Sequence, residues 1–87
     1  MLDASDKDAF WSVVEECLVE IHGLSPPDAH KRSKVLRRRI ESPPAGMSGD
    51  MIYHDDPFYV ACDIAEKQLD LSNYRSKYEP ILSRHNW

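Results

Sequence analysis

Apolar residues in the first part of the chain recur at the spacing of an α-helix. Six of them follow one another at intervals of three and four residues, which places them on one face about 100° wide. They are Phe10, Val13, Val14, Cys17, Leu18 and Ile21. Trp11 falls at the edge of this face. We predict a helix over about 6–22, which Ser5 and Asp8 begin with a capping box. Gly23 can end it in the left-handed conformation.

A second helix is predicted over 26–41. Ser25 can cap its start and Pro26 suits its first turn, while the prolines of the sequence SPP at 42–44 stop it. Its apolar residues form a narrow stripe that consists of Ala29, Leu36 and Ile40, with Val35 to one side. We therefore expect this helix to pack along one strip and to be exposed elsewhere.

The part of the chain after residue 44 predicts two helices of very different length. Ser48 can cap a single turn that ends near Tyr53, which makes a very short third helix. Asp56 followed by Pro57 then begins another helix, in which the apolar residues again keep helical spacing.

A last helix is predicted from Ser72 onward, with Tyr74 and Tyr78 on one side. Pro80 lies inside this pattern, and because a proline in a helix interior costs about 3 kcal/mol, we expect a kink or two short pieces. The sequence shows no alternating β pattern and no internal repeat. It predicts a single all-α domain over 1–87, a small four- to five-helix bundle with one very short third helix.

The composition is that of a soluble domain. Of the 87 residues, 41% are hydrophobic and 30% are charged. The longest apolar run is the five residues at 58–62, which is too short for a membrane span. The first residues are acidic and lack the apolar segment of a secretory signal. We therefore expect a cytoplasmic protein that does not associate with a membrane.

The net charge of −4 conceals a strong asymmetry along the chain. Residues 1–30 hold seven acids and one lysine, whereas the sequence KRSKVLRRR at 31–39 holds six cations and no acid. These cations form a solvated face opposite the acidic flank of the first helix, or bind an acidic protein partner, or bind nucleic acid. The acidic overall balance and the lack of aromatic residues among the cations argue against nucleic acid.

Candidate catalytic and metal-binding residues form no recognisable site in this sequence. His54, Asp55 and Asp56 are adjacent on a turn and point in different directions, so we interpret the two acids as helix caps. Cys17 and Cys62 fall on apolar helix faces, where burial raises the pKa of a thiol and makes it unreactive. Because phosphate-binding loops and nucleophile motifs are absent as well, we expect no enzyme activity, no cofactor and no metal.

The order of the predicted elements over about 6–66 resembles the colicin-type nuclease immunity proteins, which are small acidic four-helix proteins. Their short third helix carries an Asp-x-Ile-Tyr-Tyr motif that, together with the second helix, binds and inhibits a toxin nuclease domain. Asp50, Ile52 and Tyr53 match this motif, and His54 replaces its second tyrosine. The second helix of the family is acidic, whereas this one is basic, so the partner patch expected here is acidic.

These observations predict a protein-binding module, and the resemblance implies an immunity- or antitoxin-like inhibitor of a partner protein such as a toxin domain. The predicted partner-binding residues are Lys34, Arg37, Arg38, Asp50, Tyr53 and His54. Tyr53 either packs into the core or projects as an interface anchor. The alternatives are a helical adaptor with an unnamed partner and a nucleic-acid-binding protein that uses 31–39. A homodimer through an apolar strip of the second or last helix is also compatible with the pattern.

Overall fold

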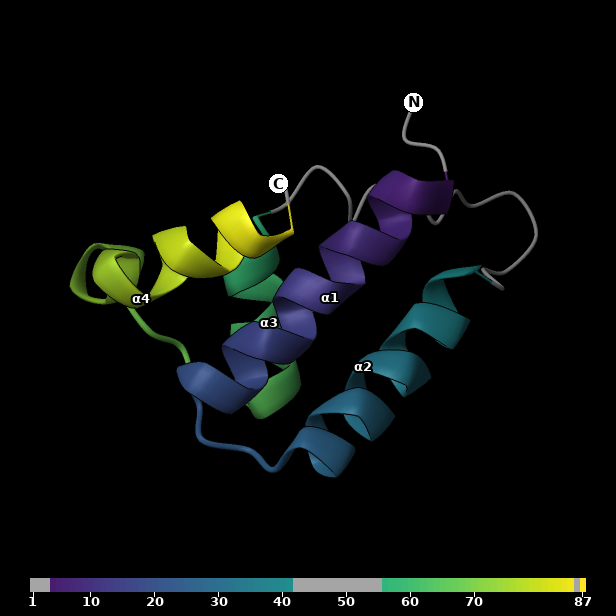
Figure 1. Ribbon diagram of the computed structural model, residues 1–87. Helices are drawn as coiled ribbons and strands as arrows, with labels where there is room; N and C mark the ends of the chain where they lie inside the picture. The colour runs from purple at the N-terminus through teal and green to yellow at the C-terminus, as the bar shows by residue number, and fades with distance from the viewer. Residues whose placement is uncertain (1–3, 42–55, 86) are drawn as a thin grey trace.

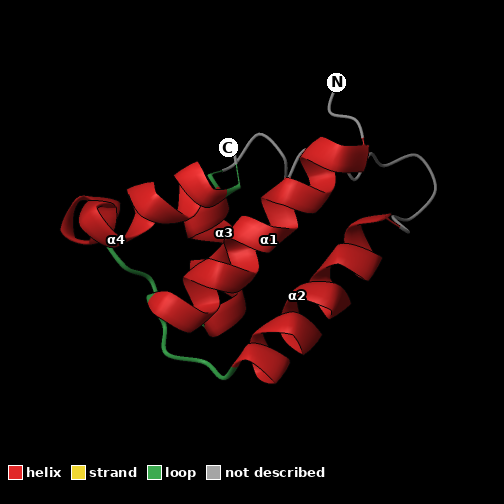
Figure 2. Ribbon diagram, in the orientation of Figure 1, coloured by secondary structure: helices red, strands yellow, loops and turns green. Residues whose placement is uncertain are grey.

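The computed structural model describes residues 4–41, 56–85 and 87, and this part of the chain contains four helices and no strand (Figure 1, Figure 2). The helices are α1 (Ala4–Glu20), α2 (Pro26–Glu41), α3 (Pro57–Ala65) and α4 (Leu71–Arg84). The predicted all-α bundle is confirmed, and α3, with nine residues, is the shortest of the four. The single turn expected to end near Tyr53 lies outside the described residues. None of the four helices is both long and apolar enough to cross a membrane.

The central element of the bundle is α1, which contacts each of the other three helices and packs most extensively on α3. In Figure 1, α2 runs along one side of α1 and α4 lies on the other side. The predicted apolar face of α1 forms the middle of the core, where Phe10, Val14 and Leu18 are fully buried. Trp11, expected at the edge of that face, is 3% exposed and belongs to the core.

The opposite wall of the core comes from α3 and α4. Phe58 of α3 is fully buried, and its ring lies edge-on to that of Tyr78 on α4, with 5.5 Å between the ring centroids. Cys17 and Cys62 are buried free thiols, as the sequence predicts. Burial raises the pKa of Cys17 to about 12 and also raises the pKa of Cys62, so neither thiol forms a thiolate near neutral pH.

The C-terminal end of α1 agrees with the prediction from the sequence, whereas the N-terminal end does not. Gly23 has a φ of +77°, so a left-handed glycine follows the end of the helix as predicted, and Leu24 N–H donates to the carbonyl of Leu18 at 2.9 Å. At the start, the helix already includes Ala4, so Ser5 lies inside the first turn and the predicted capping box is wrong. Alanine has the highest helix propensity, which favours this extension.

Serine and aspartate side chains cap the other three helices, with Asp56 at the start of α3. Ser25 Oγ accepts from Asp28 N–H at 3.4 Å, so α2 begins as predicted. The cap of α4 is Asp70, whose carboxylate accepts from Ser72 N–H at 3.1 Å, so the helix begins at Leu71, one residue before the predicted start at Ser72. Both residue types are good N-caps, and propensity alone does not choose between two that lie so close together.

Pro80 lies inside α4, which runs as one helix rather than as two short pieces. The proline has no N–H to donate to the carbonyl of Ser76 one turn earlier. Both residues are exposed, so water can reach the carbonyl that this leaves without a helix partner.

Candidate functional site

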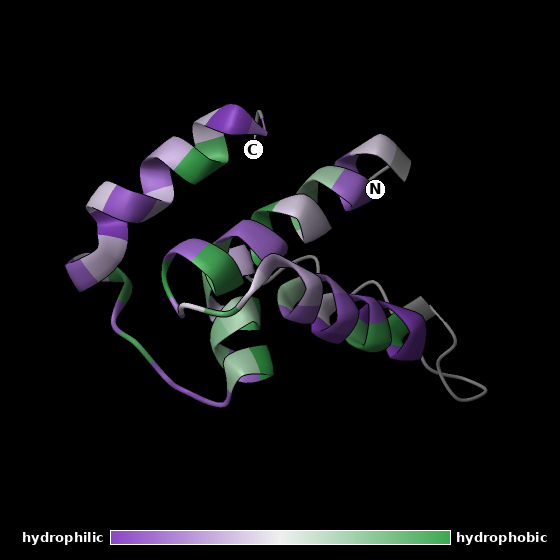
Figure 3. Ribbon diagram, turned by 60° about the horizontal axis from the view of Figure 1, so that its bottom comes forward, coloured by the Kyte–Doolittle hydropathy of each residue, from purple (hydrophilic) through white to green (hydrophobic). Residues whose placement is uncertain are grey.

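The outer side of α2 presents one continuous cationic surface. At 100° per residue, its exposed residues from 31 to 39 fall within an arc of about 160°. They are Lys31, Arg32, Lys34, Val35, Arg38 and Arg39, and we call them the basic face. On the inner side of the helix, Ala29 and Ser33 are each 1% exposed. Figure 3 compares the hydropathy of the helices: α2 is largely hydrophilic, whereas α3 is largely hydrophobic.

Most cations of the basic face have no partner in the part of the chain that the structure describes. Arg32 pairs with Asp28 one turn earlier, at 3.2 Å, and both side chains are exposed. Arg37 lies at the edge of the face and ties α2 to α1, because its Nη2 is 2.8 Å from Oδ1 of Asp8. Within the described residues, no side-chain hydrogen bond or ion pair holds Lys31, Lys34, Arg38 or Arg39. Among the described residues, Arg37 therefore pairs with the acidic flank of α1, while Lys31, Lys34, Arg38 and Arg39 remain available to a ligand.

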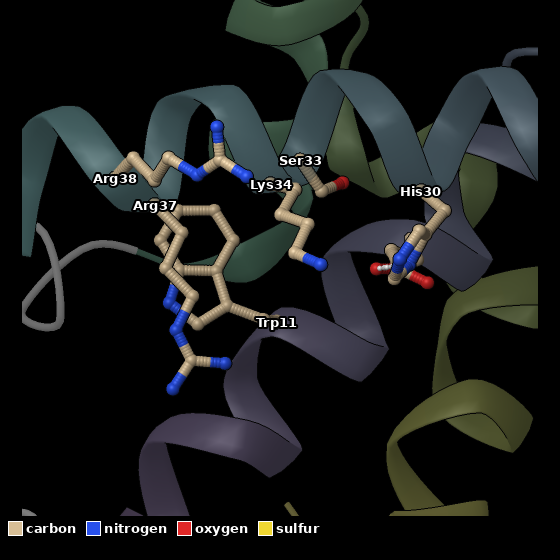
Figure 4. Close-up of a pocket in the computed structure, with 7 residues that line it drawn as sticks. Trp11, His30, Ser33, Lys34, Arg37 and Arg38 are labelled. Carbon is tan, nitrogen blue, oxygen red and sulfur yellow. Dashed lines mark hydrogen bonds and ion pairs between the residues drawn. The ribbon is translucent and has the colours of Figure 1, made fainter.

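A groove between α1 and α2 brings together the three predicted site residues of the second helix. It has a volume of about 330 Å³ and is lined by Trp11, His30, Ser33, Lys34, Arg37 and Arg38 (Figure 4). Glu15 also lines it and lies at one end, where its Oε1 is 2.8 Å from Nδ1 of His30. In Figure 4, Lys34 points from α2 toward α1, and the hydroxyl of Ser33 points into the same space.

A second groove lies on the other flank of the basic face, between α2 and α3. It has a volume of about 360 Å³, and its apolar part is formed by Val35, Leu36 and Ile64. Its polar rim consists of Lys31, Arg32, Arg39 and Asp63. Val35 is 44% exposed, and it lies near the middle of the arc of the basic face. An apolar side chain surrounded by cations suits a partner that is acidic around an apolar centre.

Several groove residues were missed by the sequence analysis. Periodicity placed Trp11 at the edge of an apolar face and gave it no role beyond packing, and Ser33 read as one more polar position of a charged helix. One available signal was the small pair Ala29 and Ser33 at i and i+4, because small residues on one stripe let a neighbouring helix approach closely. The second groove joins helices distant in sequence, which periodicity cannot reveal.

The other predicted site residues, Asp50, Tyr53 and His54, lie outside the described residues, and their roles stay predictions. In the part of the chain that the structure describes, no group of three or more His, Cys, Asp and Glu residues is placed to hold a metal ion.

Comparison with protein-family models, with characterised proteins and with solved structures gives no match.

Proposed function

We propose that this protein is a protein-binding module whose basic face docks on an acidic surface of a partner protein. The observation that carries the proposal is Val35, which is 44% exposed in the middle of five cations. Exposed apolar side chains rimmed by polar residues are typical of interaction sites. Charge alone gives loose association, whereas an apolar centre with a charged rim is the arrangement of a specific interface.

Apolar contact would supply most of the affinity. Covering Val35 together with Leu36 and Ile64 would remove a continuous apolar strip from water, and complete burial of a valine side chain contributes about 1.5 kcal/mol or more. Lys31 and Arg39 on the rim would then meet carboxylates of the partner.

The cations would mainly accelerate encounter and select the partner. Complementary charge raises association rates and rejects partners of like charge, while contributing less to net affinity. A two-fold dimer through this face would place cations against cations, so we propose a different chain as the partner.

We further propose the role that the resemblance to immunity proteins implies, namely that the protein inhibits a toxin domain in the cytoplasm. The basic helix supports this role, because its exposed outer side can be covered by another protein. The free thiols of Cys17 and Cys62 agree with a reducing compartment. Asp50, Tyr53 and His54 would then add contacts to those of the basic face.

Titration calorimetry against the purified products of adjacent genes tests the proposal. Val35→Ser and Arg39→Glu should each weaken binding of the partner by about tenfold or more, because they remove the apolar centre and reverse a rim charge. Arg75→Glu is the matched control, since it makes the same charge change on α4, where the Arg75 side chain is 65% exposed. That control should change the affinity by less than about twofold.

Equal losses in Arg39→Glu and Arg75→Glu would contradict the proposal, because binding would then follow net charge rather than this face. Nucleic-acid binding, which the net charge of −4 opposes, predicts instead a gel shift at low salt that weakens in Arg39→Glu. Growth rescue by co-expression with a toxin partner, lost in Val35→Ser, tests the inhibitor role.

A further inference from the structure

We infer that the groove between α1 and α2 is a binding site for a phosphate monoester, with Ser33, Lys34 and Arg38 as its ligands. The site shares Lys34 and Arg38 with the basic face, but it lies on the flank of α2 that faces α1. It goes beyond the proposed function because it assigns a small anion, not a protein surface, to this groove.

The hydroxyl of Ser33 is the observation that points to a ligand. Ser33 is 1% exposed, lines the groove, and its Oγ has no hydrogen-bond partner among the described residues. A buried hydroxyl without a partner destabilises the folded state, so an acceptor oxygen that reaches it gains more than an ordinary surface contact. Lys34 is exposed and unpaired within the described residues, so its ammonium can change rotamer to bind an oxygen in the groove.

The charges that face the groove favour an anion. Lys34, Arg37 and Arg38 line it, against the single carboxylate of Glu15. Glu15 lies at the end of the groove and is engaged by His30 at 2.8 Å. Arg37 is turned toward α1, where it pairs with Asp8, which leaves Lys34 and Arg38 as the two other cations that line the groove.

A phosphate monoester matches this set of donors better than a carboxylate does. It carries a charge of about −1.5 to −2 near pH 7 and three strong acceptor oxygens. The groove offers three donors in turn, namely the Ser33 hydroxyl, the Lys34 ammonium and the Arg38 guanidinium. A volume of about 330 Å³ also leaves room for the organic group of the ester.

The phosphate can belong to a small phosphorylated molecule or to a phosphorylated side chain of a protein. Both present the same oxygens to the groove, so the site is assigned to the shared chemistry and the experiment separates the two sources.

Nuclear magnetic resonance titration of the whole chain with phenyl phosphate, at constant ionic strength, tests the site. The indole N–H of Trp11 and the amide of Ser33 should shift saturably, and Ser33→Ala, Lys34→Gln and Arg38→Gln should each weaken binding by about fivefold or more. Lys31→Gln and Arg39→Gln are matched controls on the same helix, because they remove the same charge outside this groove. They should change the affinity by less than about twofold.

The site is overturned if no resonance saturates, if Arg38→Gln and Arg39→Gln lose affinity equally, or if Ser33→Ala binds like the wild type. Ser33→Ala removes a buried hydroxyl without a partner, so it should fold at least as stably as the wild type. Benzoate that binds as tightly as phenyl phosphate would also overturn the assignment.

A phosphoserine peptide that binds about tenfold more tightly than phenyl phosphate would support the site and identify a protein source. Equal affinities would support the site and favour a small molecule. Because partner binding depends on Val35 and Arg39 and phosphate binding on Ser33 and Lys34, the failure of one proposal is distinguishable from that of the other.

Discussion

The hydroxyl of Tyr78 donates a hydrogen bond to the carboxylate of Asp56, the residue that caps α3. Asp56 also accepts from the N–H of Phe58 at 3.1 Å, so one side chain serves both the helix end and the contact with α4. Burial, and then the hydrogen bond to Asp56, raises the pKa of Tyr78 above its ordinary value. The interpretation of Asp56 as a cap is confirmed, while the second contact with Tyr78 has no sequence signal.

Tyr78→Phe removes the hydroxyl and keeps the ring, so it should lower the free energy of unfolding by about 1.5 kcal/mol, the contribution of a hydrogen bond to a charged group. Urea denaturation measures this change. Tyr74→Phe is the control, because Tyr74 is half-buried and its hydroxyl has no partner among the described residues, and it should cost less than about 0.5 kcal/mol. Since the raised pKa belongs to the folded state, this stabilisation is present below pH 10 and is lost as the pH rises further. Equal losses in the two variants would contradict the role of the bond.

Glu66 ends α3 in the left-handed conformation, with a φ of +56°. A side chain costs about 1 kcal/mol in this region, which glycine enters freely. Glu66→Gly should therefore raise the free energy of unfolding by about 1 kcal/mol in urea denaturation. Glu79→Gly, in the exposed interior of α4, should instead lower it by about 1 kcal/mol. A loss of stability in both variants would show that the conformation of Glu66 is not strained.

At the scale of elements, periodicity predicted which segments are helical, and caps decided where they begin. The long apolar face of α1 and the narrow stripe of α2 identify their helices because each pattern repeats over several turns. The predicted starts of α1 and α4 are wrong by two residues and by one residue, because small differences in propensity between neighbouring positions decide where a helix begins.

Glu16 joins α1 to the end of α4, with its Oε2 3.0 Å from Nε of Arg84 and its Oε1 2.7 Å from Nε2 of His85. Burial acts to raise the pKa of Glu16, but the hydrogen bonds from Arg84 and His85 outweigh it and hold the pKa below the ordinary 4.5. A carboxylate with a lowered pKa in the folded state stabilises the fold above that value, and the stabilisation is lost as the pH falls.

Glu16→Gln should therefore lower the free energy of unfolding at pH 7 by at most about 1 kcal/mol, since the pair is partly exposed. It should also flatten the loss of stability that the wild type shows as the pH falls below 4.5. Thermal denaturation from pH 7 to pH 3 measures both effects. Glu79→Gln, whose side chain is 65% exposed, should keep the wild-type profile. A Glu16→Gln profile as steep as that of the wild type would place the acid sensitivity elsewhere.

At the scale of the whole molecule, charge along the sequence predicted the polarity of the surface but not its shape. The six cations at 31–39 predict a basic helix. The structure shows in addition that one of them, Arg37, is turned inward and pairs with Asp8. The two grooves beside the helix arise from how α1 and α3 pack against α2, and this depends on contacts between residues far apart in the sequence. Composition and periodicity contain no information about such contacts.

The proposed function requires a partner protein to cover the basic face of α2. Amide chemical shift changes on the isotope-labelled chain, followed as the purified partner is added, show directly which residues are covered. The largest changes should lie at Lys31, Val35 and Arg39, with little change along α4. Changes centred on α4, with those three amides unaffected, would contradict it.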